Sequence, residues 1–554
     1  MTNDRRPVLR LPFRLIFWWT VFALELTALL LVQLPAVYNL QTFVFYDPGS
    51  VLRADSLLAR GLSPTIDFGY SYGMLSLLFG RVLFALGGRT PAMYLVGTWL
   101  LEILIALGLA RFAIRWGWAS RALLIVAAPH AVHPIYLALT HPMEAALLIH
   151  ALADLADGRR ARALALTTAC VFIKPSLAYA LGLVLLIPVA WRLWRDRAGK
   201  GRLIKHLITT LAPAALTASF CAALIAGYFG WRPLLNSTLP FTASRSYAAL
   251  GFGFFGSGRS FWRPELNGAG DFIRYYLTTP AGFWIAASLS LCALCAATVG
   301  GFKADGAKAN DRETLIAVTA CHLFFIVALF AWPGSWAYYS YLLVLGVGTG
   351  TSLFRSGAPL SERRNEESLG NAGNAGNAEH AEKRNDPTII FRVFRYFRVF
   401  RVSRVSRFDW ICALLMLLAL TGHEQRYRGV AGDWRHSARA AETAMLWADE
   451  NQRSEWARVV ETAQRQRLLF LHNGCAGQLF PAVQSPPSWF FSPGIQTPVE
   501  IAAIRSQIET ADVVVSFNHA AILDPWTWEE FADLRAQFAA TWRGVYLTIH
   551  ERRR

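Results

Sequence analysis

The sequence predicts a mainly α protein: a polytopic bundle of transmembrane helices with a small extracytoplasmic α/β domain at the C-terminus. Hydrophobic residues make up 54% of the 554 residues, and the mean hydropathy is +0.32. Charged residues make up only 16%, against roughly 25% in a typical soluble domain. A water-soluble chain of this length would need more charge to cover its surface, so a soluble multidomain protein is excluded.

Apolar stretches that approach the length needed to cross a bilayer, roughly 20 residues, recur along the chain. We expect about eleven spans, near Leu15–Val37, Met93–Arg111, Arg121–Leu139, Pro142–Leu155, Ala163–Ile173, Ser176–Trp191, Leu207–Phe229, Gly282–Val299, Thr314–Ala331, Tyr338–Leu353 and Trp410–Thr421. Several of these are short, so tilted or broken helices are expected among them. The apolar segment Tyr72–Leu86 either lies along the membrane or dips into it.

Arginines predict the orientation of the bundle. Arg5, Arg6, Arg10 and Arg14 precede the first span, which places the N-terminus in the cytoplasm by the positive-inside rule. This span is too long for a signal peptide and has no small-residue cleavage site, so we interpret it as an anchor. The outer face then receives residues 38–92, residues 231–280 and everything after Thr421. We expect a multi-pass protein of the inner cell membrane.

The net charge of +17 is explained mostly by this topology. A nucleic-acid footprint would need a soluble basic face, so no nucleic-acid partner is expected. Residues 391–408, within a basic cytoplasmic loop at about 355–408, carry an arginine at every third position from Arg392 to Arg407. This repeat is either an interfacial segment attracted to anionic lipid or an expanded repeat in a tolerant loop, and neither interpretation puts chemistry there.

The chain divides at about residue 421 into a membrane module, 1–421, and an outer domain, 422–554. Helices are predicted near 434–466, 498–509 and 527–539, and strands at 513–517 and 545–549. Alternation of strands and helices indicates a small α/β domain. It has no G-x-G-x-x-G or P-loop, so nucleotide binding is not supported.

The first outer loop contains three acids among aromatic residues: Asp47, Asp55 and Asp67. A carboxylate beside apolar groups at a membrane surface has a raised pKa, which suits a general base that acts on a hydroxyl. The alternative is structural, with Asp47 starting a turn before Pro48 and Asp55 as a solvated helix residue.

Basic residues near the membrane are the second set of candidates. Arg245, Arg259 and Arg263 lie in the loop at 231–280, and guanidinium groups match phosphate geometry, although they could equally anchor the protein to lipid headgroups. Lys174, before Pro175, interrupts an apolar run. A lysine at membrane depth is costly and indicates a functional site. His141 is a candidate polar contact near the outer end of a span.

A basic N-terminus, one span and an outer loop with an early acid precede the passage from Gly61 to Gly73, GLSPTIDFGYSYG. This order resembles the membrane glycosyltransferases of the GT-C superfamily, which includes protein O-mannosyltransferases and aminoarabinose transferases of lipid A. The resemblance covers most of the chain as architecture and about thirty residues as sequence.

The resemblance implies a polyprenyl-phosphate sugar as donor and an acceptor that is a glycan, a lipid or a protein. It also implies Asp47 as base or acceptor-positioning residue, with Asp67 as a second acid. Many relatives carry two adjacent acids, whereas Pro48 follows Asp47 here, so no cofactor is certain and a divalent metal stays open. Because a polyprenyl phosphate is a good leaving group, the site needs a base and positive charge for the departing phosphate.

The residues expected at this site are the following: Asp47 and Asp67 as catalytic acids; Lys174, Arg259 and Arg263 at the donor phosphate; His141, Tyr70 and Arg245 as substrate contacts. One displacement would invert the anomeric centre. A multi-pass transporter or lipid flippase of envelope polysaccharide assembly is the alternative. Such proteins usually show internal repeats and midplane binding residues, and the spans show no repeat. A non-catalytic assembly protein is a further alternative.

Overall fold

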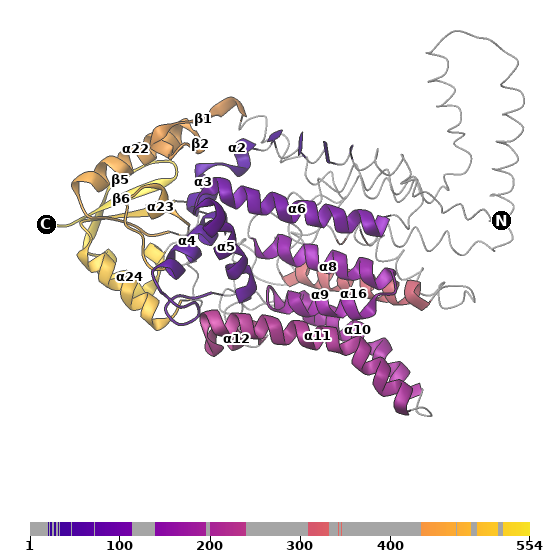
Figure 1. Ribbon diagram of the computed structural model, residues 1–554. Helices are drawn as coiled ribbons and strands as arrows, with labels where there is room; N and C mark the ends of the chain where they lie inside the picture. The colour runs from indigo at the N-terminus through magenta and orange to yellow at the C-terminus, as the bar shows by residue number, and fades with distance from the viewer. Residues whose placement is uncertain are drawn as a thin grey trace, which may run out of the picture.

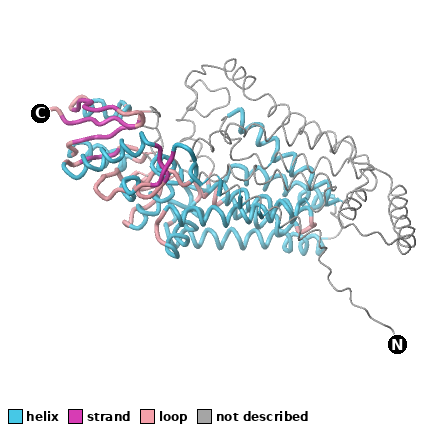
Figure 2. The backbone as a smooth tube through the Cα atoms, turned by 90° about the horizontal axis from the view of Figure 1, so that it is seen from above, coloured by secondary structure: helices cyan, strands magenta, loops and turns pink. Residues whose placement is uncertain are grey.

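The computed structural model describes the following residues (Figure 1): 20, 23–24, 27–28, 31–32, 34–45, 47–70, 72–113, 139–195, 200–239, 309–331, 342, 345, 434–472, 474–488, 496–518 and 525–554. Within them the protein is mainly helical, with a small sheet near the C-terminus. Long helices extend side by side away from this sheet, which lies at one end of the molecule (Figures 1 and 2).

The helices before residue 332 are α2 (Leu34–Val37), α3 (Leu40–Phe45), α4 (Asp47–Ala59), α5 (Met74–Gly87), α6 (Pro91–Ala113), α8 (Thr140–Ala156), α9 (Arg160–Val171), α10 (Pro175–Arg195), α11 (Lys200–Phe229), α12 (Trp231–Thr238) and α16 (Ala309–Ala331). Helix α9 packs against α8, α10 and α11, and α8 also packs against α6 and α16. Helices are therefore found at six of the predicted spans, those met by α6, α8, α9, α10, α11 and α16.

Two of the described helices are long and apolar enough to cross a membrane, at Pro91–Arg111 and Ile208–Phe229. The predicted total of about eleven spans is not confirmed. Helices α8 and α9 have only 17 and 12 residues, and Leu177–Leu186 and Glu313–Phe324 are short apolar stretches within α10 and α16. The predicted spans near 121–139, 282–299, 338–353 and 410–421 lie wholly or almost wholly outside the described residues, as does most of the first span.

Arginines at one end of the bundle bind carboxylates and tie the helices together. Asp154 of α8 is fully buried and accepts from Arg111 of α6 at 2.6 Å, and Arg162 of α9 lies 3.0 Å from its other oxygen. Arg160 pairs with Glu313 of α16, with Nη2 2.6 Å from Oε1. A buried carboxylate is stable only when it is paired in this way, so these contacts fix the order of four helices.

The C-terminal region contains β1 (Ser437–Arg439), β2 (Trp447–Asp449), α22 (Glu450–Arg465), β3 (Leu468–Phe470), α23 (Ala476–Leu479), α24 (Pro498–Thr510), β4 (Val513–Phe517), α25 (Ala532–Arg535), β5 (Phe538–Arg543) and β6 (Leu547–Arg552), with 3-10 turns at Ala441–Thr443, Pro525–Thr527 and Glu529–Phe531. Strands β3, β4, β6 and β5 form one sheet in that order. The β3–β4 pair is parallel, with Leu468 opposite Val513, and the other pairs are antiparallel.

The predicted helix at 498–509 and strand at 513–517 are confirmed. The helix predicted near 527–539 is wrong, because only Ala532–Arg535 is α-helical and Phe538–Arg543 forms the edge strand β5. Phe538 packs on Trp526 at a ring distance of 5.4 Å. Pairing with β6 therefore overrides the weak helical preference of this segment, because β propensity depends on tertiary context.

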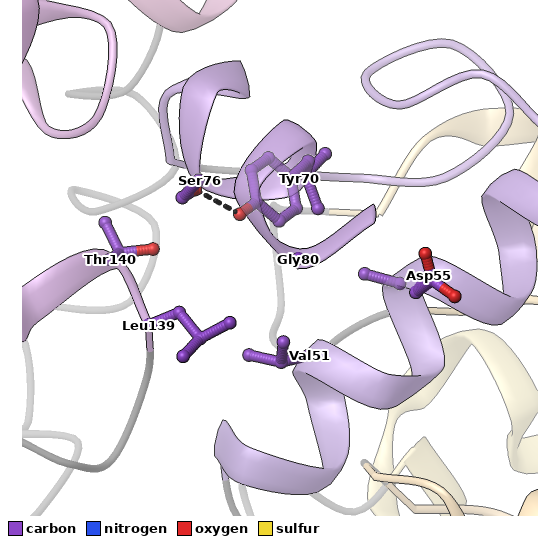
Figure 3. A pocket seen from close by; sticks show the side chains of 9 residues that line it. Val51, Asp55, Tyr70, Ser76, Gly80, Leu139 and Thr140 are labelled. Carbon is purple, nitrogen blue, oxygen red and sulfur yellow. Dashed lines mark hydrogen bonds between the residues drawn. The ribbon is translucent and has the colours of Figure 1, made fainter. Parts of the chain in front are cut away.

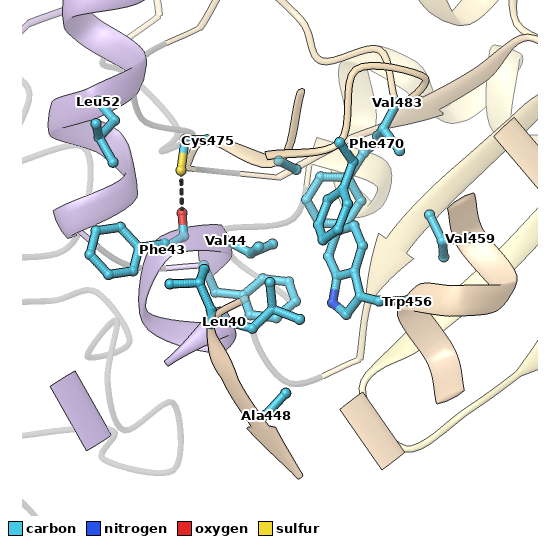
Figure 4. Packing of buried hydrophobic residues seen from close by; sticks show 14 of the residues in the cluster. Leu40, Phe43, Val44, Leu52, Ala448, Trp456, Val459, Phe470, Cys475 and Val483 are labelled. Carbon is cyan, nitrogen blue, oxygen red and sulfur yellow. Dashed lines mark hydrogen bonds between the residues drawn. The ribbon is translucent and has the colours of Figure 1, made fainter. Parts of the chain in front are cut away.

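The segment that contains α2, α3 and α4 shares one hydrophobic core with the C-terminal domain (Figure 4). The ring of Phe45 stacks on Phe517, with centroids 3.9 Å apart. The carbonyl oxygen of Phe43 accepts a hydrogen bond from the backbone N–H of Cys475 at 3.1 Å. Gly474 has φ +89°, and a Cβ there would lie 2.3 Å from the Val44 carbonyl oxygen. Helices α3 and α4 are thus held directly against the domain.

Candidate active site

Asp47 is the first residue of α4 and lies half-buried between the helical bundle and the C-terminal domain. Burial raises the pKa of this carboxyl group from its ordinary value of 3.8 to about 7, and the positive charge of Lys174 partly offsets the increase. The sequence indicates Asp47 and Lys174 as two separate candidates and predicts no contact between them. The fold brings them close enough to interact electrostatically.

Lys174 lies in the short break between α9 and α10. Pro175 begins α10, which suits proline because the first turn of a helix needs no N–H there, and the residue before a proline disfavours helical geometry. The Lys174 ammonium lies 3.2 Å from Nδ1 of His141 and 3.5 Å from Oε2 of Glu144. The break therefore directs one cation at two buried polar groups of α8.

Glu144 is not among the site residues that the sequence predicts. It is buried and lies three residues after His141 on α8, so both side chains fall on one face of the helix. An acid at that spacing from a candidate histidine, within an apolar helix, was the available signal. Its carboxylate supplies the negative charge that a buried ammonium requires.

A strap at residues 72–75 connects the Gly61–Gly73 passage to the lysine. The N–H of Gly73 donates to the Ile173 carbonyl at 2.8 Å, and the N–H of Leu75 donates to the Phe172 carbonyl at 3.0 Å. The Tyr72 hydroxyl lies 3.5 Å from Nε2 of His141, and the two rings meet edge to face. The strap therefore binds the backbone just before Lys174 through Gly73 and Leu75, and it contacts His141, the neighbour of Lys174, through Tyr72.

Gly73 allows the close approach between the strap and this loop. A Cβ at Gly73 would lie 2.0 Å from the Phe172 carbonyl oxygen, so Gly73→Ala must push the two segments apart. We expect a loss of about 1–3 kcal/mol or more in the free energy of unfolding, measured by thermal unfolding in detergent. The matched control is Gly80→Ala in α5, where the nearest atom would be 3.8 Å from the new Cβ. A Gly73→Ala variant as stable as this control would contradict the close packing.

Tyr70 lies beside this centre and lines a small pocket of about 10 Å³, room for about one water molecule (Figure 3). The Tyr70 hydroxyl and the Ser76 hydroxyl are 2.9 Å apart. The Thr140 side chain, next to His141 in the chain, also lines the pocket. The cavity therefore offers hydroxyl groups within an otherwise mostly apolar lining, next to residues that contact Lys174.

The other two acids predicted between residues 38 and 92 have local partners. Asp67 accepts from the backbone N–H of Ser63 at 2.7 Å, which closes the turn that contains Pro64. Asp55 is buried and accepts from Arg81 at 2.9 Å and from Arg89 at 2.5 Å. The structure thus places Asp47 at Lys174, while these contacts show no direct link from Asp67 to that pair.

Glu500 links the C-terminal domain to the same passage, and the sequence did not single it out. Its carboxylate caps α24, accepting from Thr497 N–H at 3.2 Å, and also accepts from the N–H of Gly69 at 2.9 Å. Burial raises the pKa of Glu500 to about 7, an increase that hydrogen bonds from Ser488, Gly69 and Thr497 partly offset. The capping motif T-x-x-E was visible in the sequence, but its second partner, more than 400 residues away, was not.

Arg245, Arg259 and Arg263 lie outside the described residues. Within the described part of the chain, no group of three His, Cys, Asp or Glu side chains could hold a metal ion. Among the described residues, the candidate centre consists of Asp47, Lys174, His141, Glu144 and Tyr72.

No protein-family model and no curated protein matches the chain. Solved structures that match include two crystal structures of ArnT from Cupriavidus metallidurans. The ArnT structure bound to undecaprenyl phosphate has 15% sequence identity and a TM-score of 0.47, and the match covers 96% of this chain and 97% of ArnT. The apo ArnT structure has 15% identity and a TM-score of 0.46, covering 97% of this chain and 98% of ArnT. Both matches extend over nearly the whole chain at a low level of similarity.

Proposed function

We propose that the protein is a membrane glycosyltransferase that moves a sugar from a polyprenyl-phosphate donor to an acceptor hydroxyl on the outer face of the membrane. The observation that carries the proposal is that Asp47 lies close enough to Lys174 for the two charges to interact. A carboxyl group whose pKa is about 7 is suited to accept a proton near neutral pH. The neighbouring ammonium, held by His141 and Glu144, is suited to bind a phosphate.

The residues divide the reaction between them. Asp47 accepts the proton of the acceptor hydroxyl, and the acceptor oxygen attacks the anomeric carbon. The bond from that carbon to the phosphate oxygen breaks, and the electron pair leaves with the polyprenyl phosphate. Lys174 stabilises the charge on the departing phosphate. A single displacement inverts the anomeric centre.

The remaining predicted residues complete this proposal. Arg259 and Arg263 are candidates for the donor phosphate with Lys174, and Arg245 is a candidate substrate contact. Tyr70 lines the adjoining small pocket and His141 contacts Lys174, and we propose both as substrate contacts. Asp67 retains the candidate role of second acid, through the turn that it closes before the strap. The proposed acceptor hydroxyl belongs to a glycan, a lipid or a protein.

Native mass spectrometry in mild detergent tests whether the protein binds a polyprenyl-phosphate donor. Wild-type protein and the Asp47→Asn variant are incubated with undecaprenyl phosphate and with undecaprenyl phosphate–hexose. We expect both proteins to retain these lipids, because Asp47 is not needed to bind phosphate, and we expect Lys174→Gln to retain much less. Retention of ordinary phospholipid only, in all three proteins, would exclude a polyprenyl-phosphate donor and would favour a transporter or an assembly protein.

The pH dependence follows from the raised pKa of Asp47. A base acts only when ionised, so transfer should increase as the pH rises through about 7. The folded protein binds this proton more tightly than the unfolded chain does. Protonated Asp47 therefore contributes fully to the free energy of unfolding below about pH 4, and this contribution is lost as the pH rises through about 7. We therefore expect Asp47→Asn to unfold at a higher temperature than wild type at pH 8, with a smaller difference at pH 5.

The pH profile needs a control variant at Glu500, because the pKa of Glu500 is also about 7. The Glu500→Gln variant keeps an oxygen that can accept from Gly69. Its activity should keep a midpoint near pH 7 if Asp47 is the base. A midpoint that disappears in Glu500→Gln would assign the titration to Glu500 instead.

A further inference from the structure

Arg53 of α4 is a charged side chain that is buried where this helix meets the C-terminal domain, with 2% of its surface exposed. Burial, and to a smaller extent the charge of Arg60, lower the pKa of the guanidinium group to about 10, while Cys475 acts in the opposite direction. Arg53 therefore keeps its positive charge at neutral pH. A buried charge of this kind needs hydrogen-bond acceptors in the surrounding protein.

The acceptors come from the C-terminal domain. Nη2 of Arg53 donates to the Ser485 carbonyl at 2.9 Å and to the Pro486 carbonyl, and Nε donates to the Ser488 carbonyl at 3.4 Å. With its amide in the orientation that satisfies both ends, Gln478 of α23 accepts from Nη1 at 3.2 Å. All of these acceptors are uncharged. Because backbone carbonyls are fixed by the course of their loop, these hydrogen bonds form only while α4 and the domain keep this relative position.

The first turn of α4 meets the same domain. A Cβ at Gly49 would lie 2.9 Å from the Cα of Gly474, so the two backbones are almost in contact. Pro48, Gly49 and Ser50 are all buried, and Asp47 begins this turn. Withdrawal of the domain from α4 would therefore admit water to the turn that carries Asp47.

Glu500 makes the reverse contact, from the domain to the membrane module. Its buried carboxylate accepts from the Gly69 N–H at 2.9 Å, and Gly69 lies in the passage that leads to the strap. The module thus gives a buried cation to carbonyl oxygens of the domain, and the domain gives a buried carboxylate to an N–H of the module. Hydrogen bonds with one charged partner are roughly twice as strong as neutral ones. The domain is therefore fixed to both α4 and the passage before the strap.

From these contacts we propose that Arg53 is a positioning residue of the transfer reaction: its guanidinium group holds α4 against the C-terminal domain and thereby keeps Asp47 buried near Lys174. Arg53 follows Asp47 by less than two turns of one helix, so a movement of α4 at Arg53 also moves the carboxylate. The role in catalysis rests on the proposed function, whereas the attachment of α4 to the domain does not. Through Arg53, the C-terminal domain sets the environment of the base.

The pH dependence of transfer tests this role. Arg53→Met removes the donors and keeps an unbranched side chain. Water that reaches the start of α4 should lower the pKa of Asp47 toward its ordinary value of 3.8. The midpoint of the rate profile should therefore fall from about 7 by about one pH unit or more. The maximal rate should decrease about 10–100-fold because the base is displaced, while retention of undecaprenyl phosphate stays unchanged.

The matched control is Arg60→Met, which removes the same charge from an exposed residue just after α4 and leaves the bonds of Arg53 intact. Its midpoint should stay near 7. Removal of a positive charge would by itself raise the pKa of a nearby carboxyl group, so a lower midpoint reports hydration and not the lost charge. Both profiles are also recorded with Glu500→Gln, because the pKa of Glu500 is also about 7. A midpoint that is unchanged or higher in Arg53→Met, or that falls equally in Arg60→Met, would overturn the proposal.

A second measurement needs no transfer. Asp47→Asn should raise the unfolding temperature at pH 8, because it removes a buried charge, and it should raise it less in the Arg53→Met background, where Asp47 is already hydrated. Equal increases in the two backgrounds would overturn the link between Arg53 and Asp47. Failure of the proposed function would look different: transfer would be absent, and the two increases would still be unequal.

Gln478→Leu keeps the proposal testable if Arg53→Met does not fold. It leaves the three carbonyls in place and removes the acceptor that binds Arg53 and the Ser56 hydroxyl of α4. We expect a smaller fall of the midpoint in the same direction. Hydrogen–deuterium exchange should become faster in α4 and stay unchanged in α11. An unchanged midpoint together with unchanged exchange in α4 would show that Arg53 does not hold this helix against the domain.

Discussion

The Asp47→Asn variant is expected to lose about 10²–10⁴-fold in transfer rate, the range contributed by a positioned general base. Asparagine has nearly the same shape and can remain at the start of α4, but it cannot accept a proton at neutral pH. The rate is measured as release of free undecaprenyl phosphate from undecaprenyl phosphate–hexose, in membranes that contain the native acceptor. Donor retention by the purified variant shows whether binding is intact.

Two further acid variants make the result specific. Asp512→Asn removes an exposed carboxylate that pairs with Arg467 in the C-terminal domain, and it should leave the rate unchanged. Asp67→Asn removes a charge but keeps an oxygen that can accept from Ser63 N–H, so a small loss assigns Asp67 to the turn. A loss as large as that of Asp47→Asn would make Asp67 a second catalytic acid. Full activity in Asp47→Asn would exclude Asp47 as the base.

The Lys174→Gln variant is expected to lose both donor binding and stability. It leaves the buried carboxylate of Glu144 without its ammonium partner, and breaking a buried ion pair from one side costs about 3–5 kcal/mol. The Lys174→Gln/Glu144→Gln double variant removes both charges, so most of the stability should return while donor retention stays low. Thermal unfolding in detergent and native mass spectrometry give the two readouts.

The comparison between single and double variants decides what Lys174 does. Equal stability of the two variants would contradict a buried ion pair between Lys174 and Glu144. Donor retention restored in the double variant would show that the ammonium does not bind the phosphate, and that the loss in the single variant came from a distorted fold. A stable double variant without donor binding supports the proposed role of Lys174.

Several elements were predictable because they depend on short stretches of sequence. Helices at six of the predicted spans were foreseen from apolar length, and the strand Val513–Phe517 from its β-branched residues. The edge strand Phe538–Arg543 was not, because it is stabilised by pairing with β6 and by Trp526 rather than by its own composition. The contact of Phe45 with Phe517 joins positions more than 400 residues apart, which no local pattern indicates.

The candidate site shows the same division. Lys174 was visible because a charge in an apolar run is costly, and Asp47 because it follows the first apolar stretch among aromatic residues. Glu144 was hidden, since one acid in a helix has many structural explanations until its partner is known. Glu500 was recognisable as a helix cap, but its bond to Gly69 required the folded chain.

Composition and hydropathy were enough to predict a mainly helical chain with a small α/β region at its C-terminus, because burying apolar surface and satisfying the backbone are local requirements. The partners of the charged residues depend on distances between segments far apart in sequence. Burial between those segments sets the pKa of Asp47 at about 7. The fold alone joins α4, the strap and the break before α10 into one centre, because loop closure and packing, unlike periodicity, leave no regular trace in the sequence.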